Sequence, residues 1–348
     1  MSDIARSTAS DGVPSGRAKP HGTTLGSLAG KSAIFLILIA LLAIFAVIQP
    51  VFLRAANLLD ILEAVSVTAL LGLGITVSLA VGGFDLSVGS TAAMGVMTAA
   101  YAQVVWGWGA VPTVLLVLGV GIGIGLFNSL LIIVLRVPDL LATLGTLFLV
   151  GGLQLIPSAG NSISTGMVFA DGSEADGVFS PTFLALGRLR LWGLVPLPVI
   201  ILGIVAVLLW VLMERLRWGR AIYAVGGNER AAHLAGAPTA RLRVFAYVLS
   251  GLLSSLGGIL LAARVGRGDI MTGGSLLQDS FAAALIGFAV LNLRRPNILG
   301  TVIGAVLVGV LLNGLTMLNA PYYTQDFIKG AVLVGSLALT YRLGRDRR

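Results

Sequence analysis

Residue types that perform chemistry are few in this chain, and they do not cluster. The sequence has no cysteine, and its two histidines, His21 and His233, lie far apart in polar segments. Thiolate chemistry is therefore excluded, and a histidine-based metal centre has little material. The carboxylate in the most unusual setting is Asp85, in the stretch GGFDLSVGS between two long apolar runs. It has no convincing carboxylate partner, so the sequence gives little support to an enzyme embedded in a membrane.

The residues around Asp85 predict a helix break. Gly82 and Gly83 end one helix in conformations that other residues avoid, and Asp85 or Ser87 accepts hydrogen bonds from the free N–H groups of the next helix. In the structural interpretation Asp85 only caps a sharp turn. In the functional interpretation the break lines a translocation pathway and moves with it, because irregular backbone at membrane depth survives only beside protein or water. The two interpretations are compatible, and Gly82, Gly83, Asp85 and Ser87 become pathway or gate candidates.

The composition places these residues in a membrane. Of the 348 residues 57% are hydrophobic and 11% are charged, against about 25% charged residues in soluble domains. Runs long enough to cross a bilayer predict an all-α polytopic protein of about ten spans. The runs lie near residues 33–49, 58–81, 86–106, 110–135, 140–157, 193–213, 243–264, 280–293, 297–318 and 326–342.

The basic residues predict the orientation. Most of the 23 Lys and Arg residues fall in segments that a cytoplasmic N-terminus places inside, which puts both termini in the cytoplasm. The net charge of +8 therefore reflects membrane topology and not nucleic-acid binding. We expect a disordered cytoplasmic tail over 1–32, a transmembrane domain over 33–342 with a cytoplasmic loop at 214–242, and a basic cytoplasmic tail over 343–348.

A shift of 185 residues reveals an internal duplication. It brings Gly72 onto Gly257, Gly83 onto Gly268 and Asn128 onto Asn313, and it maps spans two to five onto spans seven to ten. Because the copies are five spans apart, an odd number, they run in opposite directions through the bilayer. Such inverted repeats are typical of transporters, with the pathway between the halves.

Four polar residues within apolar spans extend the list of candidates: Asn128, Thr143, Thr146 and Asn313. Each either bonds a neighbouring helix or lines the pathway. A polar but little-charged pathway suits sugars better than ions, whose pores usually carry rings of charge.

The longest inner loop predicts a short docking helix. Gly226-Gly227 is read as a turn, Asn228 as the N-cap of a helix over 229–235, and Gly236 with Pro238 as its end. A helix of two turns is unstable alone, so it docks, either through its small face (Ala231, Ala232, Ala235) in a partner's groove or among lipid headgroups. The coupling candidates are Gly226, Gly227, Asn228, Glu229, Arg230, Ala231, Ala232 and Gly236. The stretch LGSLAGKS near the N-terminus lacks the first glycine of a phosphate-binding P-loop and a preceding strand.

Several blocks in order resemble one family. GGFDLSVGS, GLFNSLLIIVLRVPDLLATLGTL, the loop WGRAIYAVGGNERAAHLAGAPTARLRVFAYVLSG and NGLTMLNAPYYTQDFIKGAVLV are similar to the membrane permease subunits of bacterial ATP-binding-cassette importers for monosaccharides. The resemblance covers about residues 33–342. It departs from the family at Arg294-Arg295-Pro296, where a Gly-rich turn is usual, which bears on the substrate and on subunit pairing.

The resemblance implies a subunit of the inner membrane with no cofactor and no catalysis of its own. ATP and Mg would bind a cytoplasmic partner that receives the short helix, and a periplasmic protein would deliver the sugar. A second permease subunit, identical or not, would complete the channel. The cargo would be a simple sugar, a polyol, a deoxysugar or a sugar-like signal. The main alternative is an ion-coupled secondary transporter of a small neutral solute.

Overall fold

The computed structural model describes residues 25–168, 172, 174–290 and 295–345, and helices dominate it. The first half contains α1 (Leu25–Ile48), α2 (Ala55–Ala80), α3 (Val88–Ala100), α4 (Ala110–Ser129), α5 (Asp139–Leu153) and α6 (Pro181–Arg188). The second contains α7 (Leu197–Trp210), α8 (Arg217–Gly227), α9 (Glu229–Leu234), α10 (Thr239–Val265), α11 (Thr272–Val290), α12 (Ile298–Met317) and α13 (Tyr322–Arg345). Short π-helical turns extend α3, α4 and α7 at Tyr101–Val105, Leu130–Val134 and Val211–Arg215, and a 3-10 turn, Ile156–Ser158, follows α5.

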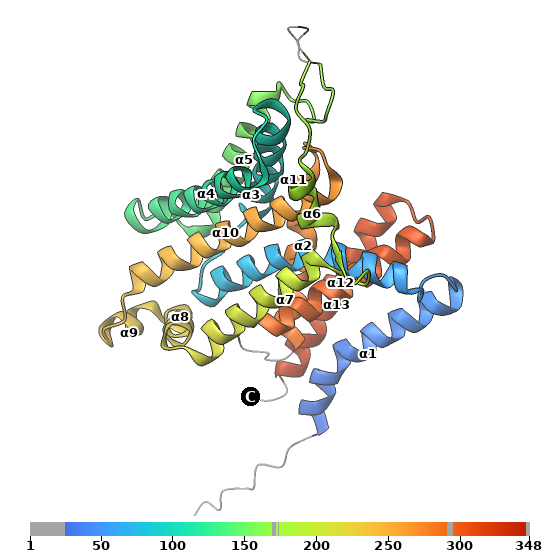
Figure 1. The fold of residues 1–348 in the computed structure, drawn as a ribbon. Coiled ribbons are helices and arrows are strands. Elements are labelled where there is room, and N and C mark those ends of the chain that lie inside the picture. Colours follow the sequence, from blue (N-terminus) through green and yellow to red (C-terminus); the bar gives the residue numbers. More distant parts are fainter. Residues whose placement is uncertain (1–24, 169–171, 173, 291–294, 346–348) are drawn as a thin grey trace, which may run out of the picture.

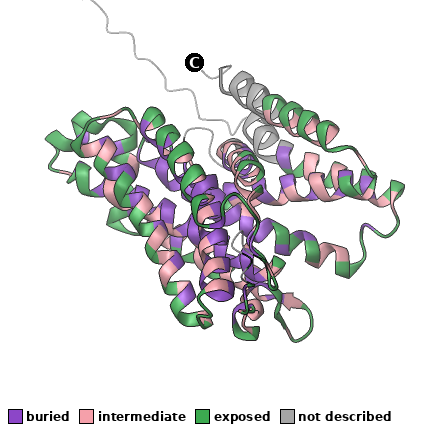
Figure 2. Ribbon diagram, turned by 90° about the horizontal axis from the view of Figure 1, so that it is seen from above, coloured by how far each residue is buried: buried purple, intermediate pink, exposed green. Residues whose placement is uncertain are grey.

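Helices α2 and α10 form the centre of the bundle. They pack side by side, and α10 also contacts α3 and α4, while α2 contacts α11 and α12 (Figure 1). Almost every residue of α2 from Val65 onward is buried, and the buried residues gather in the middle of the bundle (Figure 2). Helices α4, α5 and α7 bury only one face, as expected of helices whose other face meets lipid.

Seven of the described helices are long and apolar enough to cross a membrane. Including their π and 3-10 extensions, they are Ala55–Ala80, Val88–Val105, Ala110–Val134, Asp139–Ser158, Leu197–Arg215, Thr239–Val265 and Ile298–Met317. The prediction of a polytopic helical membrane protein is therefore confirmed. Helices α1, α11 and α13 occupy the other three predicted spans; α11 begins at Thr272, well before the predicted start, and residues 291–294 lie outside the described part.

Two further helix boundaries differ from the predicted ones. Helix α1 begins at Leu25, inside the segment expected to be a disordered tail. The sixth span begins at Leu197 and not at residue 193, because the preceding residues form a hairpin of β1 (Arg190–Leu191) and β2 (Val195–Pro196). Its turn contains Trp192 and Gly193 at φ 53° and 69°, a local geometry that the apolar count does not detect.

Ion pairs join the hairpin to α2, and α2 to α10. The Glu63 carboxylate of α2 lies 2.9 Å from Nε of Arg264 at the end of α10, and Asp60 lies 2.8 Å from Arg190 of β1. Glu63 is buried, and its second neighbour, Arg190, stands 3.9 Å away. The first turns of α2 are thus joined to the last turn of α10.

Candidate translocation and coupling site

The break after α2 is closed by a Schellman motif. Gly82 donates its N–H to the carbonyl of Leu79 (3.0 Å), and Gly83 donates to that of Ser78 (2.9 Å). Gly82 has φ +83°, which favours glycine. The predicted helix end is therefore confirmed at these two residues.

Gly83 is needed for space and not for conformation. A Cβ atom at Gly83 would collide with the hydroxyl of Tyr247 and lie 2.8 Å from Oδ2 of Asp139. Gly82 in turn faces Gly226 of α8, whose Cα would be 3.1 Å from an added Cβ. The break is thus in close contact with α10, α5 and the loop that contains α8.

Asp85 is buried and accepts three hydrogen bonds. Its Oδ1 accepts from the backbone N–H of Ser87 (3.0 Å) and from the Ser87 hydroxyl (2.6 Å), and its Oδ2 accepts from the Ser250 hydroxyl of α10 (2.7 Å). The first two bonds form a local turn of the Asx type. Asp85 is therefore an acceptor as predicted, but its backbone donor is Ser87, which precedes α3, and no side chain of the described residues caps the free N–H groups of α3.

The polar candidates of the spans separate into two groups. Asn128 donates to the Ser87 hydroxyl (2.8 Å), and Thr143 donates to the carbonyl of Phe84 (3.1 Å), so both contact the break. Thr146 is buried and donates to Ala142 of its own helix. Asn313 accepts from Asn57 in the first turn of α2 (3.1 Å), at the opposite end of that helix from the break.

The predicted short helix is present, but the residues that precede it do not form the predicted turn. Asn228 accepts from the N–H of Ala231 (3.0 Å), which confirms the N-cap, and Gly236 has φ +84° after the helix end. The predicted turn at Gly226-Gly227 is wrong, because both residues belong to α8. Gly226 is small because α8 lies on the backbone of Ala80, and an added Cβ would collide with the Ala80 carbonyl oxygen.

The predicted small face of α9 is divided between two directions. Ala232 is buried within the chain, whereas Ala231 and Ala235 are exposed. Leu234 is 86% exposed, and Arg230 also faces outward. The surface that α9 offers to a partner therefore contains two alanines and one leucine instead of the three predicted alanines.

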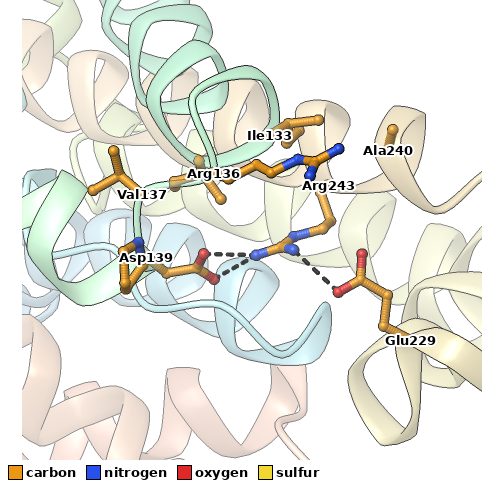
Figure 3. A pocket seen from close by; sticks show the side chains of 9 residues that line it. Ile133, Arg136, Val137, Asp139, Glu229, Ala240 and Arg243 are labelled. Atoms are coloured by element: carbon orange, nitrogen blue, oxygen red, sulfur yellow. Dashed lines mark hydrogen bonds and ion pairs between the residues drawn. The ribbon is translucent and has the colours of Figure 1, made fainter.

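Arg243 of α10 joins α9 to α5. Its guanidinium bonds both oxygens of Asp139, at 2.6 and 2.8 Å, and lies 3.1 Å from Oε2 of Glu229 (Figure 3). The three side chains line an open pocket of about 380 Å³ that also contains Arg136, whose φ is +57°. Sequence reasoning used Arg136 and Arg243 only to orient the spans, and it missed Asp139, Arg243, Tyr247 and Ser250 as neighbours of the break.

The unusual segment after α11 contacts the same loop. Arg295 pairs with Glu214 (2.9 Å) and lies over the ring of Tyr223 (4.6 Å), and the Tyr223 hydroxyl donates to the carbonyl of Pro296 (2.9 Å). Burial, with a smaller contribution from Glu214, raises the pKa of Tyr223 to about 12. Arg294 lies outside the described residues.

Comparisons with known proteins agree with this arrangement. A family model described as "Branched-chain amino acid transport system / permease component" matches residues 57–337. The Ribose import permease protein RbsC of Bacillus subtilis is 36% identical over 309 residues, 89% of this chain and 92% of its own length. That of Escherichia coli K12 is 35% identical over 85% of this chain and 89% of its own.

A further relative has another cargo in its name. The Autoinducer 2 import system permease protein LsrD of Klebsiella pneumoniae is 34% identical over 309 residues, 87% of this chain and 89% of its own length. No solved structure matches the chain. The chain therefore belongs to the family of transport-system permease components, as a multi-pass permease subunit of an ATP-binding-cassette importer in the inner membrane and not as an enzyme.

Proposed function

We propose that this chain translocates a monosaccharide or a sugar-like signal across the inner membrane, powered by ATP hydrolysis on a separate subunit. The observation that carries the proposal is the contact between the buried polar break after α2 and the loop containing α8 and α9. Because of this contact, the helix break, where a pathway can open, lies beside the loop on which a partner subunit can act. Relatives named for ribose import and for autoinducer 2 import support the cargo class.

The proposed topology has ten spans, an inverted repeat of spans two to five and seven to ten, and both termini in the cytoplasm. Helix bounds support the repeat: shifted by 185 residues, α2 (Ala55–Ala80) falls on 240–265, and α10 is Thr239–Val265. The packing also exchanges as a repeat requires, since α10 lies on α3 and α4 while α2 lies on their counterparts α11 and α12.

Charge pairing supports the proposed sides of the membrane. The topology puts Arg190 and Arg264 outside, and each forms an ion pair with a carboxylate near the start of α2. It puts Arg243 and Arg295 inside, and each forms an ion pair with a carboxylate near α8 and α9. Among the described ion pairs none joins a residue of one proposed side to a residue of the other.

The break then forms a gate toward the cytoplasm. Arg243 and Ser250 are seven residues apart on α10, so the Asp85 carboxylate lies about 10 Å deeper in the membrane than the Arg243 ion pairs. We assign the gate to Gly82, Gly83, Asp85, Ser87, Asn128, Thr143 and Thr146, and we place Asn313 near the outer end of the pathway. The hydroxyls and amides of this set can bind the hydroxyl groups of a neutral cargo.

The coupling surface consists of the exposed face of α9 and the end of α8 that precedes it. We assign it to Gly226, Gly227, Asn228, Glu229, Arg230, Ala231, Ala232 and Gly236, with Ala232 and Gly226 holding the helices to the permease and Ala231 and Leu234 meeting the partner. The proposed partners are an ATP-binding subunit that holds ATP and Mg, a periplasmic sugar-binding protein, and a second permease subunit, identical or different, within the lipid bilayer.

Co-purification from native membranes tests this function. The chain, tagged at its C-terminus and extracted gently, is expected to bring down an ATP-binding subunit, and a non-identical permease in the same sample would establish a heterodimer. A co-purified periplasmic binding protein would then be screened with labelled ribose and other sugars. Recovery of this chain alone, where a known importer stays intact, would contradict the proposal and favour an ion-coupled secondary transporter. Uptake would then depend on the ion gradient and not on ATP.

A further inference from the structure

One face of α10 connects the coupling loop to the break. Arg243, Tyr247 and Ser250 are spaced by four and three residues, so their side chains lie in one row along the helix. Arg243 bonds Glu229, the Tyr247 hydroxyl lies against Gly83, and Ser250 donates to Asp85. The row therefore begins at α9 and ends at the gate.

The two ion pairs of Arg243 differ in exposure. The Asp139 side chain is 17% exposed and accepts two hydrogen bonds from one guanidinium nitrogen. The Glu229 side chain is 49% exposed and accepts one. Solvent screens the second pair more strongly than the first, so Arg243 is held firmly to α5 and releasably to α9.

Asp139 passes this attachment to the break. Asp139 is the first residue of α5, and its Oδ2 lies beside Cα of Gly83, so close that a Cβ there would be 2.8 Å away. The next turn of α5 supplies Thr143, whose hydroxyl donates to the carbonyl of Phe84. A shift of Asp139 together with α5 would therefore disturb the contacts that hold the backbone of residues 83–84.

We propose that Arg243 is a positioning residue that transmits displacement of α9 to the gate, through Glu229 on one side and Asp139 on the other. The inference rests on the proposed function, since it requires an ATP-binding subunit that moves α9. When the partner pulls α9, Glu229 draws the guanidinium with it, and the Asp139 pair carries the motion to Gly83 and Phe84. When Glu229 releases, the gate relaxes against α10.

Glu229→Gln isolates the α9 side of this junction. The substitution keeps the size of an exposed side chain and leaves the Arg243–Asp139 pair intact. In the complete complex in proteoliposomes, we expect sugar uptake per ATP hydrolysed to fall at least about fivefold in Glu229→Gln, the lower range of coupling between distant sites, with uptake and hydrolysis both normalised to the amount of complex assembled in each preparation. Arg243→Lys should behave alike, because an ammonium group lacks the planar fork that meets two carboxylates. Arg241→Gln is the matched control, because Arg241 lies on a different face of α10 and has no ion pair among the described residues.

A single thiol at the gate distinguishes transmission from a general loss of stability. The chain has no cysteine, so Phe84→Cys introduces one reactive site. We expect its labelling rate to depend on whether the complex holds ATP with vanadate or no nucleotide, and to lose that dependence when Glu229→Gln is added. Equal uptake per ATP, or unchanged nucleotide dependence of labelling, in Glu229→Gln and Arg241→Gln would overturn the inference. If the unmodified complex shows no ATP-dependent uptake, the proposed function itself fails.

Discussion

The contact between Gly226 and the end of α2 predicts that two adjacent glycines will respond oppositely to alanine. Both are helical residues of α8, and neither has a positive φ. A Cβ on Gly226 would collide with the carbonyl oxygen of Ala80 and lie 3.0 Å from the N–H nitrogen of Gly82. A Cβ on Gly227 would have no neighbour within 4 Å.

The magnitudes follow from these surroundings. The atoms that Gly226→Ala would strike are backbone atoms held in the Schellman motif, so they cannot yield as a flexible side chain can. Overpacking of this kind costs about 1–3 kcal/mol, against a gain of up to about 1 kcal/mol from replacing glycine in a helix. Gly227→Ala receives only the gain. We therefore expect Gly226→Ala to be about 1–3 kcal/mol less stable than Gly227→Ala, because the gain is common to both, and Gly227→Ala to equal or exceed the unmodified chain.

Thermal unfolding of the full chain in one detergent, scanned at one rate, measures this difference. Gly226→Ala should melt a few degrees below Gly227→Ala. ATP-driven uptake should fall with Gly226→Ala, because α8 must move away from Gly82 to accommodate the methyl group. Equal melting temperatures and equal uptake for the two variants would refute the close packing of α8 on the break.

Three further predictions use other contacts. Asp85→Ala removes three hydrogen bonds in a buried site and should cost about 3–6 kcal/mol, whereas Asp85→Asn, which can still accept from Ser87, should lose less than half as much stability in SDS titration. Gly125→Ala, against the backbone of α10, should lower the melting temperature, and Gly123→Ala, which faces open space, should not; equal values would contradict the α4–α10 contact. The pKa of Tyr223 is raised to about 12 from 10.0, so its contribution is full below pH 10 and is lost as pH rises through 12. Tyr223→Phe should flatten the fall in melting temperature across that window, and an unchanged slope would argue against the buried hydroxyl.

The sequence predicted those features that depend on local chemistry. Apolar run length located seven spanning helices, since the bilayer sets the length directly. Asp85 accepts hydrogen bonds and Asn228 caps α9 as expected, because each bond joins residues two or three positions apart. The chemistry of the residue and its neighbours was enough in these cases.

Features that depend on distant segments were missed. Ser250 bonds Asp85 from 165 residues away, and a serine in an apolar helix has no sequence mark that distinguishes it from Ser254, which bonds its own helix. Gly226 was read as a turn because the same residue type serves a turn and a close backbone approach. The sequence does not show that Ala232 faces the permease and not a partner, because this depends on how α9 lies against the rest of the chain.

The ion pairs at the hairpin have a mechanical consequence for the whole bundle. Glu63 and Arg264 join α2 to α10 at one end, so a lengthwise slide of one central helix past the other would break the ion pair of the buried Glu63 carboxylate. A relative motion of the two helices that keeps this pair is a tilt about that end. From Glu63 to the end of α2 at Ala80 is 17 residues, about 26 Å, so a tilt of about 5° displaces that end by about 2 Å. The displacement is largest where Gly82 meets Gly226, so a small angular change near the hairpin becomes a movement of about 2 Å at the gate.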